Sequence, residues 1–189
     1  MSRISALWGN VFKEKTNERS VAAVLRRIPV FSGLSKSEMK QVEKIIYLRT
    51  YQEGEVIFVE GEPGAGMYVI ESGKIRICLG PNTDEEHEIA MLENGDFFGE
   101  LALIDDHPRS ATAVAVASTR LIGFFRSELI SIISRSPRLG VKLQQNMMQI
   151  LVKRLRITDQ RLHDCNELSL ELQQKLDARS NAAAEEQAK

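Results

Sequence analysis

The residues with the clearest potential for binding chemistry in this chain lie between Gly95 and Thr112. A glycine turn leads into a short apolar stretch that begins with Glu100, and Arg109 follows a proline. Backbone N–H groups at a helix start point toward an anion, a guanidinium can bind two phosphate oxygens, and a carboxylate accepts hydrogen bonds from ribose hydroxyls. These residue types at this spacing could bind a sugar and a phosphate together. The simpler alternative is a surface turn with a solvated Glu and Arg.

The segment resembles the phosphate-binding cassette of the cyclic-nucleotide-binding domain, which occurs in bacterial cyclic-AMP receptors, kinase regulatory subunits and nucleotide-gated channels. That cassette reads Phe-Gly-Glu-Leu-Ala-Leu, a short variable turn, then Pro-Arg-x-Ala, and this chain has the two parts at residues 98–103 and 108–111. The resemblance implies a cyclic-nucleotide site made by Phe98, Gly99, Glu100, Leu101, Ala102, Arg109, Ser110 and Ala111.

The same resemblance implies a role for each part of the cassette. The backbone N–H groups of residues 99, 101 and 102 would surround the phosphate, Glu100 would bind the ribose 2′-hydroxyl, and Arg109 would pair with the cyclic phosphate. Ser110 and Ala111 would close the pocket from the other side. Family members that prefer cyclic GMP often have a threonine directly after the arginine, whereas Ser110 resembles the bacterial cyclic-AMP receptor. We therefore expect cyclic AMP as the ligand in preference to cyclic GMP.

The overall composition is that of one globular domain of ordinary size with extensions. The chain has 189 residues, a hydrophobic content of 43% and a formal net charge of −1, which argues against a nucleic-acid-binding surface over the whole protein. No segment approaches the roughly 18 apolar residues of a spanning helix, and the start lacks a secretory signal, so we expect a cytoplasmic protein. The two cysteines, Cys78 and Cys165, do not indicate a disulfide framework.

From Tyr47 onward the sequence predicts a mainly β domain. Short runs rich in Val, Ile, Phe and Tyr alternate with glycine turns, a pattern typical of a β sandwich, jelly roll or barrel. The glycine spacing also resembles that of the same family, so we expect a double-stranded β-helix (jelly-roll) barrel with N-terminal helices and a long C-terminal helix. By analogy with the family, Ile77, Ile89 and Leu92 would form an apolar wall near the ligand, or they are plain core. The expected strands are 56–59, 67–70, 74–79, 87–92, 111–117 and 121–125, and the turn glycines are Gly54, Gly61, Gly73, Gly95 and Gly99.

Three helical stretches are expected before the strands. Residues 3–19 place apolar side chains on one face with basic residues around them, a pattern that suits a membrane surface or a partner. Packing on the chain's own domain or on a sister subunit is the favoured interpretation. A second stretch, 21–28, ends before Pro29. Ser35 and Glu38 read as a capping box that opens a third helix through about Ile46.

The C-terminal region predicts a long helix and a homodimer. Ser127 begins a short helix, and Ser136 followed by Pro137 opens the long one. An apolar seam with alternating steps of three and four suggests a two-stranded parallel coiled coil, with packing on the chain's own barrel as the alternative. The seam is Met148, Leu151, Leu155, Thr158, Leu162, Cys165, Ser169, Leu172 and Leu176.

Residues 153–159 are similar to the helix segment of the bacterial cyclic-AMP receptor whose threonine contacts the adenine amino group. Thr158 and Asp159 fall at the positions of the two base-contacting residues. The chain departs from the receptor at Asp159, where the receptor has a neutral hydroxyl residue. A carboxylate there could accept a hydrogen bond from an adenine amino group or point to water.

The expected organisation is an N-terminal helix at 1–20, a nucleotide-binding β-barrel at 21–135, a dimerisation helix at 136–179 and a polar, frayed tail at 180–189. Bacterial receptors of the family continue into a helix-turn-helix domain, for which the sequence offers no segment, so DNA is not an expected partner. His87, His107 and His163 lack metal-ligand spacing, and no nucleophile has an identifiable base.

We therefore expect a non-enzymatic, stand-alone cyclic-nucleotide receptor without a cofactor, which signals to an unknown protein partner. The alternative is a nucleotide-free scaffold that uses the same fold for dimerisation and partner recruitment. A DNA-binding regulator is disfavoured by the missing domain.

Overall fold

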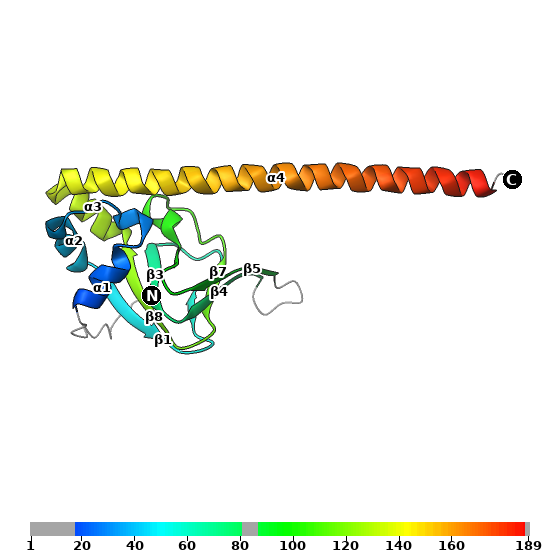
Figure 1. Cartoon of the computed structure of the whole chain (residues 1–189). Coiled ribbons are helices and arrows are strands. Elements are labelled where there is room, and N and C mark those ends of the chain that lie inside the picture. The colour runs from blue at the N-terminus through cyan, green and yellow to red at the C-terminus, as the bar shows by residue number, and fades with distance from the viewer. Residues whose placement is uncertain (1–17, 81–86, 188–189) are drawn as a thin grey trace. The chain divides into compact units, whose positions relative to one another are not determined.

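A computed structural model describes residues 18–80 and 87–187 of the chain (Figure 1). The chain divides into two compact units, Met1–Asn146 and Met147–Lys189. The expected amphipathic helix at the N-terminus falls almost wholly outside the described residues.

The first unit is a sandwich of two four-stranded antiparallel sheets, which confirms the jelly-roll type of fold. One sheet has the strand order β1-β8-β3-β6 and the other β2-β7-β4-β5, so each sheet pairs strands that are distant in the sequence. The glycine-bounded runs became strands as expected, whereas the sequence analysis did not identify β1 and β6. The strands are β1 Tyr47–Tyr51, β2 Val56–Phe58, β3 Gly66–Ser72, β4 Lys74–Leu79, β5 His87–Glu93, β6 Phe97–Phe98, β7 Thr112–Ala115 and β8 Thr119–Phe125.

The register of the second sheet decides which residues of β5 reach the core. Leu92 lies opposite Ile75 and Ala90 lies opposite Ile77, so these side chains share the inner face. Both Ile77 and Leu92 pack against the core cluster. Ile89 falls on the opposite face and is 52% exposed. The expectation of Ile89 as plain core was therefore wrong, because this residue lies where the pairing register shifts between Ile77 and Cys78 of β4. Its place in an apolar wall near the ligand stays a prediction.

The glycine turns have the backbone conformation that their residue type permits. All five glycines expected at turns have positive φ, from 72° at Gly99 to 108° at Gly73. A side chain at Gly73 would also meet Thr119, since a Cβ there would lie 2.3 Å from the threonine Oγ1. Glycine is thus required where β3 turns into β4.

Short helices gather beside the β1-β8-β3-β6 sheet (Figure 1). The predicted capping box is present: the Glu38 N–H donates to Ser35 Oγ at 3.2 Å, and the Ser35 N–H donates to the Glu38 carboxylate at 2.7 Å. This helix ends at Glu43, slightly before the expected limit. These elements are α1 Glu18–Leu25, the 3-10 helix η2 Pro29–Phe31, α2 Lys36–Glu43 and α3 Arg126–Arg135.

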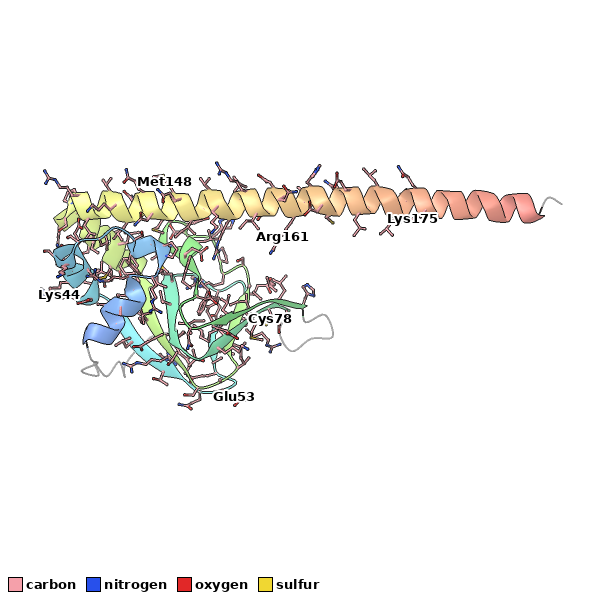
Figure 2. The ribbon with its side chains drawn as sticks, viewed as in Figure 1. Lys44, Glu53, Cys78, Met148, Arg161 and Lys175 are labelled. Carbon is pink, nitrogen blue, oxygen red and sulfur yellow. The ribbon has the colours of Figure 1, made fainter. Side chains whose placement is uncertain are left out.

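The long helix α4 runs from Pro137 to Gln187 and begins at the predicted proline. It passes the expected limit at Arg179, so the backbone of residues 180–187 is helical and is not the frayed tail that its polar composition suggested. Arg161 and Lys175 extend from this helix in Figure 2 and are exposed. Among the residues that the structure describes, no helix combines the length and apolarity needed to cross a bilayer.

The first turns of α4 belong to the first unit and are tied to the N-terminal helices. Lys142 Nζ donates to both Glu38 carboxylate oxygens, at 2.8 and 2.9 Å. The Asn146 side chain donates to the carbonyl oxygens of Val30 and Ser32. The start of α4 is therefore held by one ion pair and by one amide that bridges two carbonyls.

We predict that Glu38 contributes stability that is lost in acid. Hydrogen bonds from Lys142 and from the Ser35 backbone lower the pKa of Glu38 from 4.5 to about 2. Because the folded-state pKa is depressed, the contribution is present above the unfolded-state pKa and disappears as the pH falls through the folded-state value. Glu38→Gln should reduce the free energy of unfolding by about 1 kcal/mol near pH 7, since solvent screens the half-exposed lysine.

The difference between Glu38→Gln and the wild-type protein should shrink as the pH falls from 4.5 and should vanish below about pH 2. Urea denaturation across the acid range would measure it. Glu43→Gln, at the other end of α2, is the charge-matched control. A difference that stays constant with pH would show that the ion pair is not responsible.

Candidate functional site

The predicted cassette occupies the edge of the first sheet. Phe98 in β6 pairs with Tyr68 in β3, and Gly99 then turns the chain into a 3-10 helix, η3, at Glu100–Leu103. Gly99 has φ of 72°, and a Cβ at this position would lie 2.6 Å from Arg109 Nη1. Glycine is therefore needed here both for the turn and for the close approach of Arg109.

A second loop fixes the backbone of Arg109. The Arg109 N–H donates to the Glu62 carbonyl and the Gly61 N–H donates to the Arg109 carbonyl, both at 2.8 Å. Pro63 and Pro108 form a β-bridge beside these bonds. The backbone of Arg109 is thus held in place independently of the contacts of its side chain.

The Arg109 side chain is buried, with only 8% of the residue exposed. Its Nη1 donates to the Gly99 carbonyl at 3.1 Å and its Nη2 donates to the Gly66 carbonyl at 2.8 Å. The Nε atom is buried without a hydrogen-bond partner. No carboxylate among the described residues forms an ion pair with this guanidinium. A buried cation that retains an unsatisfied donor is a site for an anion.

The electrostatics of Arg109 reflect this burial. Removal from water lowers the pKa of Arg109 below its ordinary value, and the nearby Tyr68, Glu100 and Glu62 oppose the shift. Glu100 is itself 3% exposed. The structure therefore places the buried Glu100 carboxyl group near the buried Arg109 guanidinium. These are the two groups that the sequence resemblance assigned to the ribose and to the phosphate.

The remaining cassette residues lie around this pair. Ala102 and Ala111 are buried, whereas Leu101 and Ser110 are exposed. The Ala102 N–H donates to the Gly99 carbonyl at 3.2 Å within η3. This N–H, expected to bind the phosphate, is therefore already engaged in the turn. The eight cassette residues thus come together in one region, with different access to solvent.

The two residues expected to contact the base lie on α4, in the second unit. Both Thr158 and Asp159 are exposed, and Thr158 Oγ1 donates to the Arg154 carbonyl at 3.0 Å, one turn earlier. The roles of Thr158 and Asp159 in contacting the base remain predictions.

Arg126, which the sequence analysis did not identify, holds the cassette from the junction of β8 and α3. Its Nε donates to the Ala102 carbonyl at 2.8 Å and its Nη2 donates to the Gly64 carbonyl at 3.2 Å. It also contacts the carbonyl of Asp105 and pairs with the carboxylate of Asp106. One side chain thereby joins η3, the variable turn and the loop before β3. Nothing in the sequence pattern distinguishes this arginine from other surface cations.

Glycines before β3 complete the surroundings of Arg109. A Cβ at Gly64 would lie 2.6 Å from the Ala102 Cβ and 3.3 Å from Arg109 Cζ. Gly66 supplies the carbonyl that Arg109 Nη2 binds. The Gly-Ala-Gly sequence at 64–66 was a signal for close packing that the sequence analysis did not use.

A separate shallow hollow of about 490 Å³ lies between α2 and the start of α4. It is lined by Glu38, Gln41, Ser136, Pro137, Arg138 and Leu139. It shares no residue with the cassette, so it is not part of the candidate site.

Residues 48–136 match the family model of the cyclic nucleotide-binding domain. Residues 48–136 therefore form a domain of this family. The matched residues include both parts of the cassette, with Glu100 and Arg109, and the two sheets that position them. The resemblance stated from the sequence is thereby confirmed.

Known relatives of the chain include two bacterial regulators. The cyclic AMP receptor protein of Thermus thermophilus is 35% identical over 131 residues, covering 69% of this chain and 59% of that protein. A CRP-like cAMP-activated global transcriptional regulator of Mycobacterium tuberculosis is 30% identical, covering 75% of this chain and 61% of that protein. The chain thus spans about three fifths of the length of these relatives.

A solved structure agrees with the sequence comparisons. The crystal structure of the Thermus thermophilus catabolite activator protein superimposes with a TM-score of 0.63 and 35% identity, over 71% of this chain and 61% of that one. These two relatives are named as a receptor protein and as a transcriptional regulator.

We predict that Gly99→Ala weakens cyclic-nucleotide binding through Arg109. The added methyl would meet the guanidinium, whereas a Cβ at Gly95, which also has positive φ, would meet nothing within 4 Å. Each substitution should cost about 1–2 kcal/mol of stability because of its backbone conformation. Only Gly99→Ala should also raise the dissociation constant for the cyclic nucleotide, by about tenfold or more, because it displaces the Arg109 guanidinium.

Calorimetric titration with cyclic nucleotide, alongside thermal unfolding, would separate the two effects of Gly99→Ala. Equal losses of affinity in Gly99→Ala and Gly95→Ala would contradict the steric explanation.

Proposed function

We propose that the chain is a cyclic-nucleotide receptor that binds cyclic AMP in preference to cyclic GMP and signals through protein–protein contacts. The observation that carries the proposal is the buried Arg109, whose Nε has no hydrogen-bond partner and whose neighbour Glu100 is also buried. Membership of the cyclic nucleotide-binding domain family supports the same ligand class.

In the proposed complex, the cyclic phosphate approaches Arg109 from the side of Nε and receives a charge-assisted hydrogen bond. The backbone N–H groups of Gly99, Leu101 and Ala102 add further donors, and the Ala102 N–H would exchange the Gly99 carbonyl for a phosphate oxygen. Glu100 accepts a hydrogen bond from the ribose 2′-hydroxyl. The single negative charge of the ligand compensates the buried cation, which is why the ligand stabilises this arrangement.

The proposed choice of base rests on Ser110, Thr158 and Asp159. Thr158 is the residue placed by resemblance at the adenine amino group, and its exposed hydroxyl donates to its own helix backbone. It therefore retains acceptor capacity for an amino group. The Thermus thermophilus relative is a cyclic AMP receptor protein by name, which supports cyclic AMP as the ligand.

The proposed output is a protein surface and not a catalytic reaction. For a switch, the nucleotide must bind one arrangement of the chain more tightly than another. The long helix α4 is the element proposed to form a homodimer, because its apolar seam is exposed at Met148, Leu155, Leu162 and Leu172. A nucleotide-free scaffold would use the same seam but would leave Arg109 without a compensating anion.

The direct test is calorimetric titration of the full chain with cyclic AMP and cyclic GMP. We expect micromolar or tighter binding with cyclic AMP favoured. Arg109→Met should raise the dissociation constant at least about 100-fold, because charged hydrogen bonds of about 1.5–3 kcal/mol each are lost.

Arg135→Met, which replaces an exposed arginine of α3, is the matched control and should bind normally. No binding of either nucleotide to folded protein would reject the receptor and favour the scaffold.

A second test addresses the homodimer. Leu155 and Leu162 are each 60% exposed and occupy equivalent positions of the seam. The double substitution Leu155→Glu, Leu162→Glu should weaken self-association by about 100-fold or more, because two carboxylates would be buried per helix. Sedimentation velocity would measure the shift to monomer, with Lys153→Glu as the control away from the seam. A wild-type protein that is monomeric at high concentration would contradict this proposal.

A further inference from the structure

We propose that Phe58 is the positioning residue that holds the Arg109 guanidinium for the nucleotide phosphate. The inference rests on the proposed function, and it adds a residue outside the cassette to the binding machinery. Arg109 Cζ lies 4.1 Å from the centroid of the Phe58 ring, which is within the range of a cation–π contact.

The local structure of β2 brings this ring to the arginine. The pairing of β2 with β7 shifts between Val56, which lies opposite Val114, and Phe58, which lies opposite Ala113. Because of this irregularity Ile57 and Phe58 both pack against the core, although they are consecutive residues of one strand. The fully buried Ala113 is small enough to leave space for the ring.

Other aromatic side chains fix the orientation of Phe58. Its ring centroid is 6.1 Å from that of Tyr68 and 5.8 Å from that of Phe98, and the interplanar angles are 32° and 43°. Tyr68 and Phe98 in turn stack on each other at 5.6 Å. The orientation of the Phe58 ring relative to Arg109 is therefore set by aromatic packing between the two sheets.

An aromatic ring suits this position better than a carboxylate. The negative face of the ring stabilises the buried cation without accepting an N–H bond, so the Nε donor stays available. A carboxylate would pair with the guanidinium and compete with the phosphate for the same donors. The carbonyls of Gly99 and Gly66 each accept one hydrogen bond, from Nη1 and Nη2, and the ring covers one face of the guanidinium plane. The Nε–H has no hydrogen-bond partner and is therefore left for the ligand.

The test replaces Phe58 by phenylalanines with one, two and three ring fluorines, introduced at this position alone in the full chain. Fluorine withdraws electron density from the ring face while changing the volume little. The dissociation constant for cyclic AMP should rise stepwise, by about 5- to 30-fold over the series. The control is the same series at Phe31, which is buried against Phe124 and contacts no cation among the described residues. This series should leave the dissociation constant for cyclic AMP unchanged.

A second readout needs no nucleotide. The Nε–H resonance of Arg109, identified by its loss in Arg109→Lys, should be displaced by the ring current of Phe58. The displacement should disappear in Phe58→Leu, which keeps an apolar side chain. The corresponding substitution Phe31→Leu should leave the resonance in place.

The two readouts separate the failure of this inference from failure of the receptor. If the wild-type protein binds cyclic AMP but affinity is constant across the Phe58 series, the positioning role of Phe58 is wrong. If the wild-type protein binds no nucleotide, the proposed function fails, and the Nε–H resonance decides only whether Phe58 positions the guanidinium. A resonance that is unchanged in Phe58→Leu overturns that positioning, and one that loses its displacement supports it.

Discussion

The burial of one positive charge is the constraint on which the site depends. Arg109 is removed from water between the loop before β3 and the turn after β6, and its charge is met by two carbonyl dipoles and a ring face. Such an arrangement is stable only if the backbone that carries those carbonyls is held in place. The glycines at 64, 66 and 99 permit the close approach, and the bonds between Arg109 and residues 61–62 fix the chain on the other side.

Arg126 also holds the backbone around Arg109 in place, although it does not belong to the cassette. It binds the carbonyls of Ala102 and Gly64, and its own N–H donates to the Ala65 carbonyl. The turn that carries Glu100 and the loop beside Arg109 are thus joined through the first residue of α3. Any displacement of η3 must either take α3 with it or break these bonds, which gives the cassette a direct mechanical connection to the helices that follow the barrel.

Much of the fold and of the cassette could be predicted from the sequence because both depend on local patterns. The turn glycines, the capping box at Ser35 and the start of α4 at Pro137 are set by backbone preferences of single residues. The inward or outward direction of Ile89 was not predictable in this way, since it depends on the register between β4 and β5. Phe58 and Arg126 were missed for a similar reason: their contacts are with residues far away in the sequence, and an apolar strand residue or a cation at a helix start is otherwise ordinary.

The continuity of α4 has a geometric consequence. The helix has 51 residues without a break, and 41 of them follow Asn146, whose side chain donates to the Val30 carbonyl. At about 1.5 Å per residue this part is about 60 Å long. A rotation of about 5° at its base would therefore displace its end by about 5 Å, roughly one helical turn. A small rotation would thus become a large displacement at the C-terminal end of this helix, where a partner could detect it as a change of register.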